Sequence, residues 1–231
     1  AGKANIYRLA KYDTSQALKI LTSDAEQGVA EAQVMLGKMH EEGHHFPKNY
    51  IIAFNWYKRA ATQGNVPGKL HLYKIAKKGV PKALKILIDD ARRGVAQAQF
   101  HLGFMYKNGH QFPQDNDEAF RWYQLSANQG YVHAQLHLGQ MYEKGEAVPQ
   151  NYDEAVRRYR FGAEIGIGEA QFRLGLMYYK GQGVPQDYVL ADMWFILSSI
   201  RKIKEATKYR SLVENKMSPQ QIEKAQLMAR N

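Results

Sequence analysis

Two pairs of histidines have a spacing that could bind a metal ion, among the eight in this 231-residue chain. His133 and His137 lie four residues apart, which would place both imidazoles on one face of a helix, and His40 and His44 have the same separation. Neither pair has a third histidine or a carboxylate at a fixed spacing, and no HExxH motif occurs. We therefore expect no metal site. Packing explains His40 better, and His133 and His137 could instead contact a partner.

Nucleophilic and phosphate-binding chemistry has no support in the sequence. Without cysteine, the chain has neither a thiol nucleophile nor a disulfide. GxSxG and P-loop motifs are absent, and the glycine-rich stretch that begins at Gly181 belongs to a recurring turn. Paired acids such as Glu41 and Glu42 are typical of a solvated helix face. We predict that the protein is not an enzyme and uses no cofactor.

Positive charge is the stronger chemical signal. Lysine and arginine number 32 against 22 aspartates and glutamates, a formal net charge of +10, which favours an acidic protein, anionic lipid or nucleic acid as partner. Lysines gather in GKLHLYKIAKKGVPKALKIL (68–87). Most tyrosines and tryptophans recur at predicted core positions, which leaves few to stack on bases, and the basic residues are spread along the chain. An acidic protein is the partner we expect.

A repeat predicts the elements that must position these residues. Its first half occurs as AQVMLGKMHEEG, AQFHLGFMYKNG, AQLHLGQMYEKG and AQFRLGLMYYKG, and its second as AFNWYKRAATQG, AFRWYQLSANQG and AVRRYRFGAEIG. Apolar residues fall at helical spacing in both halves, as in Ala98, Leu102 and Met105, and glycine closes each helix. No strand-like alternation competes. Each repeat thus predicts two helices joined by a turn, and stacked pairs would bury a common core.

The predicted fold is all-α: a right-handed α/α superhelical solenoid of about six helix–turn–helix repeats plus C-terminal capping helices. Residues 2–21 align without gaps with 68–87, and both segments lack the long turn of the other repeats. The first and third repeats are therefore short. We place the solenoid at 1–200 and the capping helices at 201–231. The repeats fall at about 1–28, 29–64, 65–94, 95–130, 131–166 and 167–200.

The motif LGLMYYKGQGVPQDYVLA (174–191) resembles the signature of the Sel-one-like repeat (SLR), a relative of the tetratricopeptide repeat. The resemblance extends over the chain to about residue 200. It implies the solenoid described above and an adaptor or scaffold role rather than one chemistry. The tail is similar to the helix that closes bacterial members. Ser218 would be its N-cap, Pro219 its first residue and Gln221 the partner in a capping box.

The resemblance also implies that the first helix of each pair lines a concave face on which a partner binds. In the register of Leu36 and Gly37, this face combines apolar side chains with basic ones, as protein interfaces do. The alternative is that Phe100 and Phe172 pack against the adjacent helix and the lysines are merely solvated. The predicted partner-binding residues are Lys38, Leu70, Lys74, Lys77, Lys78, Phe100, Phe104, Lys107, His133, Leu136, Lys144, Phe172, Leu176, Tyr179 and Lys180.

The function we expect is that of a monomeric, non-enzymatic interaction module, which binds an acidic protein along its concave face as a cell-envelope adaptor or scaffold. One alternative, implied by short exported relatives, is an immunity protein against a phospholipase-type toxin of type VI secretion. A nucleic-acid or anionic-lipid binding protein is another.

No apolar run approaches the roughly 18 residues of a membrane span, so we expect no transmembrane segment. We expect a periplasmic or otherwise exported protein, with the cytoplasm as the alternative. The reasons are the usual location of the family's members, the net positive charge and a start at AGKA rather than Met.

Overall fold

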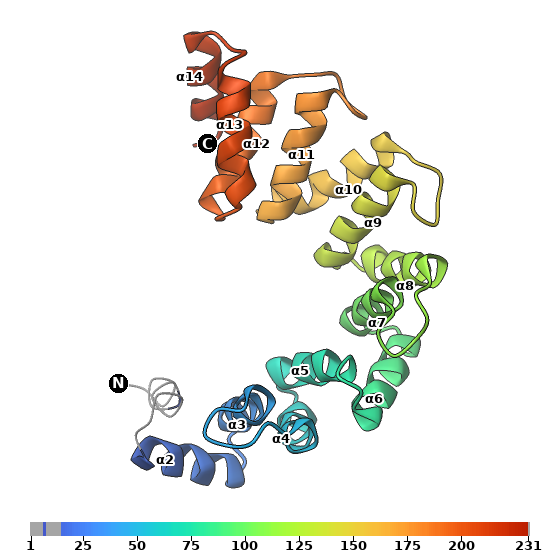
Figure 1. The fold of residues 1–231 in the computed structure, drawn as a ribbon, viewed down its shortest axis with the longest axis vertical. Coiled ribbons are helices and arrows are strands. Elements are labelled where there is room, and N and C mark those ends of the chain that lie inside the picture. Colours follow the sequence, from blue (N-terminus) through green and yellow to red (C-terminus); the bar gives the residue numbers. More distant parts are fainter. Residues whose placement is uncertain (1–6, 8–14, 231) are drawn as a thin grey trace. The chain divides into compact units, whose positions relative to one another are not determined.

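The computed structural model describes residue 7 and residues 15–230, and all regular structure in these residues is helical (Figure 1). The predicted all-α repeat fold is confirmed, whereas the helix expected before residue 15 lies outside the described residues. The helices are α2 (Ser15–Glu26), α3 (Ala30–Glu42), α4 (Tyr50–Thr62), α5 (Val66–Ala76), α6 (Pro81–Arg92), α7 (Ala96–Asn108), α8 (Asn116–Asn128), α9 (Val132–Lys144), α10 (Tyr152–Glu164), α11 (Gly168–Lys180), α12 (Tyr188–Ile200), α13 (Lys204–Glu214) and α14 (Pro219–Met228).

These helices form two compact units, Ala1–Gln114 and Asp115–Asn231. In the first unit, α3 packs on α4, α5 packs on both α4 and α6, and α6 packs on α7. In the second unit, α11 packs on both α10 and α12, and α12 also contacts α13 and α14. Helices that follow one another through short turns therefore lie side by side, which is how each repeat buries the apolar face of the previous one. Every helix of the described part is too short or too polar to cross a lipid bilayer.

Glycines and side-chain caps set the helix ends. Gly43 follows α3 in the left-handed conformation (φ 83°), which glycine adopts without steric cost. The side chain of Asn49 accepts hydrogen bonds from the backbone at the start of α4. At the last helix, Ser218 and Gln221 form the predicted capping box, with Pro219 in the first turn.

In long repeats, an aromatic ring from the second helix lies directly on a glycine of the first, a tyrosine in α4 and α10 and Phe195 in α12. A Cβ atom on Gly37 would be 2.6 Å from the ring of Tyr57, and one on Gly139 would be 2.6 Å from the ring of Tyr159. Both tyrosines are fully buried. No larger residue fits opposite the ring unless the helices separate, so the recurring LG of the motif is a packing requirement.

The buried phenol groups donate to carboxylates at the end of the first helix. Tyr57 Oη donates to Glu41 and Tyr159 Oη to Glu143, each at 2.6 Å. His71 of α5 stacks on Tyr57, with ring centroids 4.7 Å apart, and lies 3.8 Å from the Glu41 carboxylate. Hydrogen bonding to His71, which outweighs the effect of burial, lowers the pKa of Glu41. A polar pair therefore joins the two helices of a repeat, and a basic side chain of the next repeat meets it.

The short repeats reverse this arrangement. Tyr73 of α5 occupies the repeat position that is glycine in the long repeats. Leu87 of α6 occupies the position of the tyrosine that lies on this glycine, and both Tyr73 and Leu87 are buried. Tyr73 Oη donates to Asp90 on the second helix at 2.6 Å, and Tyr7 makes the same bond to Asp24. In the short repeats the tyrosine thus comes from the first helix and the acid from the second.

The C-terminal helices have the sequence spacing of a short repeat, and both pack on α12. α13 and α14 begin 138 residues after α5 and α6, respectively (204 against 66, and 219 against 81). Their cluster on α11 and α12 includes Ala206 and Val213. The Arg210 guanidinium of α13 lies 3.3 Å from the buried carboxylate of Asp192 on α12. The second unit therefore ends with α13 and α14, which both cover α12.

We expect Gly139→Ala to lower the free energy of unfolding by about 1–3 kcal/mol, because the added methyl group overlaps the buried Tyr159 ring. Denaturant unfolding followed by circular dichroism measures the change. Gln140→Ala, at the next and partly exposed position, is the control and should change it by less than about 0.5 kcal/mol. Equal effects of the two substitutions would contradict this account of the glycine.

Candidate functional site

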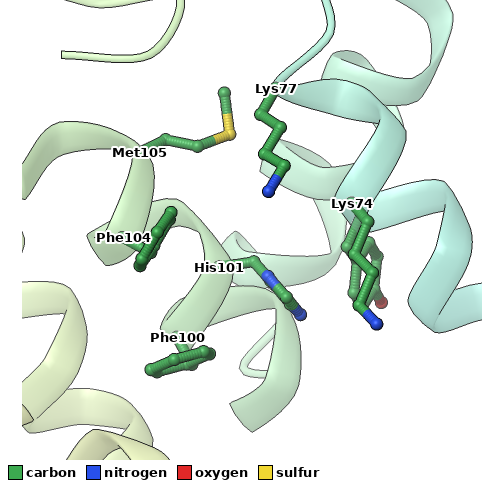
Figure 2. Close-up of a pocket in the computed structure, with 7 residues that line it drawn as sticks. Lys74, Lys77, Phe100, His101, Phe104 and Met105 are labelled. Carbon is green, nitrogen blue, oxygen red and sulfur yellow. The ribbon is translucent and has the colours of Figure 1, made fainter. Parts of the chain in front are cut away.

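A hollow of about 140 Å³ opens between α5 and α7 in the first unit (Figure 2). Two first helices meet here, and their side chains on the shared face line the space. α5 contributes Tyr73, Lys74 and Lys77, and α7 contributes Phe100, His101, Phe104 and Met105. Lys74 and Lys77, like Phe100 and Phe104, project from one face of their helix because they are one turn apart.

The floor of the hollow is held by buried polar contacts. Tyr73 and Met105 are each 1% exposed. The Asp90 carboxylate that accepts from Tyr73 also meets Lys69, with Nζ at 3.2 Å, and the Arg93 guanidinium. Burial alone would raise the pKa of Asp90, but hydrogen bonds from Tyr73 and Lys69 outweigh it and hold the pKa below its ordinary value. The charged carboxylate therefore fixes the orientation of the Tyr73 ring.

The walls are aromatic. The His101 ring lies 5.4 Å from that of Phe100 and 5.8 Å from that of Tyr73, measured between centroids. Phe104 lies 6.0 Å from His110 of the following turn. An apolar cavity of about 150 Å³ accepts a benzene ring. This hollow is therefore large enough for one aromatic or branched aliphatic side chain.

Two ammonium groups stand at the mouth. Lys77 Nζ lies 5.8 Å from the centre of the Phe104 ring, and Figure 2 shows this side chain reaching into the space between the helices. Lys74 is exposed beside it. Neither lysine forms an ion pair within the part of the chain that the structure describes. Gln111 donates to the Lys77 carbonyl at 3.3 Å and so fixes the end of α5. The site joins an apolar hollow to a positively charged rim.

Four of the predicted partner-binding residues meet in this hollow: Lys74, Lys77, Phe100 and Phe104. Three others belong to the same two helices or the adjoining turn without lining it, namely the partly buried Leu70 and Lys107 and the exposed Lys78. Lys38 is partly buried on α3.

The prediction was wrong for three apolar positions of the second unit, which are buried. Leu136 is 8% exposed, and Phe172 and Leu176 are each 7% exposed. The Phe172 ring packs on Phe195 of α12 and Tyr209 of α13, with centroids 5.7 and 5.5 Å away. These side chains cannot bind a partner because the elements stacked on them cover them. The alternative, that Phe172 packs against an adjacent helix, is what the structure shows.

The other predicted residues of the second unit differ in exposure. Tyr179 is partly buried, and the ammonium of Lys216 lies 5.5 Å from its ring centre while Tyr209 packs on its edge. The remaining three are exposed: His133, Lys144 and Lys180. Of these, Lys144 lies 3.9 Å from the carboxylate of Glu146.

Sequence reasoning missed Tyr73, His101 and Met105 as parts of the site. A signal was available, because His71, His101 and His137 recur two residues before the glycine or tyrosine position. Each of them packs on the ring of a tyrosine, as His137 does on Tyr123 at 5.0 Å. The histidine at this position thus forms a contact between neighbouring helix pairs, and the one in α7, His101, also lines the hollow.

The histidine pairs show no metal-binding geometry. His40 stacks on Phe46, with centroids 4.4 Å apart, which is the packing role expected for it. Throughout residue 7 and residues 15–230, no three histidine or acidic side chains gather as ligands would.

Comparison with known proteins identifies the class. The family model of the Sel1 repeat matches residues 30–65, 96–131, 132–166 and 168–199, together more than half of the chain. The chain therefore belongs to the Sel1 repeat family, whose members are generally protein-interaction modules. The short pairs α5–α6 and α13–α14 lie outside the matched segments. A search of curated proteins found no match.

Solved structures agree with this assignment. A protective antigen of uropathogenic Escherichia coli with an SLR fold is 31% identical over 98% of this chain, with a TM-score of 0.69; this chain spans 50% of that one. A Sel1 repeat protein of Oxalobacter formigenes is 28% identical, with 96% and 94% of the two chains covered and a TM-score of 0.64. A Pseudomonas aeruginosa protein, 19% identical with a TM-score of 0.53 and with 94% and 88% of the chains covered, shares the fold.

Asp90→Asn should make the stability of the protein less dependent on acid pH. Because the pKa of Asp90 is depressed in the folded state, its contribution is complete above the unfolded pKa of about 4 and is lost as pH falls through the folded pKa. We expect the variant to lose about 1.5–3 kcal/mol at pH 7 and progressively less below pH 4.

Denaturant midpoints at a series of pH values measure this difference. The exposed neighbour Asp89, changed to Asn, is the matched control and should stay close to wild type at pH 7. A constant difference between Asp90→Asn and wild type from pH 7 to pH 3 would refute the role of the charge.

Proposed function

We propose that the protein is a non-enzymatic adaptor that binds an acidic segment of a partner protein at the hollow between α5 and α7. The observation that carries the proposal is the combination of an aromatic hollow with two lysines that no acid of the described chain pairs. An apolar side chain of the partner would fill the hollow, and carboxylates beside it would meet Lys74 and Lys77. Protein interfaces combine the two kinds of group in this way: the buried apolar area contributes affinity, and the charged groups steer the approach of the partner and fix its register.

Membership of the Sel1 repeat family supports the protein partner, because repeat solenoids bind by shape and charge on a rigid surface. The relative from uropathogenic E. coli is described as a protective antigen. We infer that the present chain acts in the cell envelope, as a monomeric scaffold whose rigid helices hold a partner without altering it.

The test is capture of partners from the native organism by wild type and by Lys74→Glu/Lys77→Glu/Phe104→Ala. We expect a stoichiometric acidic protein that the variant loses, with at least about a tenfold drop in affinity when the purified pair is measured by calorimetry. Lys82→Glu/Lys85→Glu, two exposed lysines of α6 outside the hollow, makes the same change of charge and should retain the partner.

If both variants lose the partner equally, net charge rather than the hollow is responsible, and the proposal fails. It also fails if the partner survives the hollow variant. A folded secreted toxin as the captured partner would keep the binding site but change the biological role to that of an immunity protein.

A further inference from the structure

Helix α6 has two sharply different faces. One face packs into the core of the first unit against α5 and α7. The opposite face is exposed and carries charged residues at spacings of three and four, which align along the helix. The buried residues are Ala83, Leu87, Asp90 and Ala91. The exposed residues, here called the α6 stripe, are Lys82, Lys85, Asp89 and Arg92.

The stripe differs from the corresponding positions of α8 and α10, which hold an acid and an arginine; in α4 and α12 these positions carry no charge. In α8 the positions that correspond to Lys82 and Lys85 hold Glu118 and Arg121, whose side chains form an ion pair of 3.0 Å. α10 has the same pair of residue types there, at 2.8 Å. In α6 both positions are lysine, so a favourable neighbour pair is replaced by a repulsive one. Without an ion pair inside the helix, the two lysines of α6 are available to bind an anionic molecule outside the chain.

The cations of the stripe are not neutralised within the protein. Lys82, Lys85 and Arg92 take part in no ion pair among the residues described, and the only acid on the same face is Asp89. Lys78, exposed in the turn before α6, adds another charge at the helix start. From Lys82 to Arg92 the stripe extends about 15 Å at about 1.5 Å per residue.

We propose that the α6 stripe docks the protein on the anionic headgroups of a phospholipid membrane. Clusters of lysine and arginine on a helix face bind such surfaces through charge alone. The stripe has no aromatic side chain to stack on nucleic-acid bases and no apolar centre of the kind a protein interface requires. Charge complementarity with a flat polyanion is therefore the interaction that the surface fits best.

The orientation of the stripe allows both sites to work together. Leu87 and Ala83 point toward α5 and α7, so the stripe lies on the side of α6 turned away from those helices. A chain lying on the membrane through α6 leaves the hollow open to a partner. The inference does not depend on the proposed function, because it rests on different residues and a different ligand.

Vesicle flotation of the purified chain tests the proposal. At low salt we expect wild type to float with vesicles of about 40% phosphatidylglycerol in phosphatidylcholine, not with phosphatidylcholine alone, and to be released at high salt. Lys82→Glu should reduce the vesicle-bound partition by about tenfold or more, since it removes one cation and adds an anion. It should leave the melting temperature unchanged or raise it, because it restores an acid three residues before Lys85.

Lys74→Glu is the matched control, because it changes the net charge equally but lies at the hollow. It should retain most of the vesicle binding, while Lys82→Glu should retain the captured protein partner. The two proposals can therefore fail separately. A second variant, Lys82→Gln/Lys85→Gln, removes two charges without new repulsion and should also lose the vesicles.

Three results would overturn the assignment. The first is that wild type does not bind vesicles that contain phosphatidylglycerol. The second is that Lys74→Glu and Lys82→Glu weaken vesicle binding equally, because net charge alone would then explain the effect. The third is tighter binding to a duplex DNA than to the anionic vesicles, lost in Lys82→Glu, which would make the stripe a nucleic-acid surface.

Discussion

A buried phenol hydroxyl that donates to a carboxylate joins the two helices in long and short repeats alike, although α12 has Phe195 in place of the tyrosine. In the long repeats the ring of Tyr159 lies on Gly139 while its hydroxyl reaches Glu143. A hydroxyl left unpaired at that depth would cost about 1–3 kcal/mol, so the acid is needed as much as the space above the glycine. The short repeats keep the same contact with its partners exchanged, Tyr73 on the first helix and Asp90 on the second.

The exchange bears on the charge of the proposed binding site beside a short repeat. In two long repeats the end of the first helix holds the acceptor acid, Glu41 or Glu143, whereas the same position is Lys107 in α7 and Tyr179 in α11. The corresponding position of α5 is Lys77. Because Asp90 has taken over the acceptor role, this position is free to carry a cation, and Lys77 reaches over Phe104 at the mouth of the hollow. The exchanged hydrogen bond is therefore compatible with the positive charge at this end of α5.

The α6 stripe and the lysines of the hollow lie on the part of the chain that the family model does not match, whereas the aromatic wall of the hollow belongs to a matched repeat. The family model leaves out the pair α5–α6, whereas the flanking long repeats match it. The regular repeats supply stacking surfaces, and the irregular pair supplies more than half of the net charge of +10, with six lysines and two arginines against two aspartates between residues 66 and 93. Family membership therefore predicts the scaffold and the general role in protein interaction, while binding specificity has to be sought in the short pair.

The sequence by itself determined the repeat, the helices and their ends, because glycine turns, caps and apolar periodicity act over a few residues. It also grouped Lys74 with Lys77 and Phe100 with Phe104, since positions one turn apart share a helix face. Only the tertiary structure decided which apolar positions stay accessible. Phe100 and Phe172 hold the same place in the repeat, yet Phe172 is buried beneath Tyr209 of α13, and Phe100 lines a hollow. Whether such a side chain is buried depends on which element stacks next to it and on how much of the space the side chains of that element fill. Both are determined by residues that are distant in the sequence.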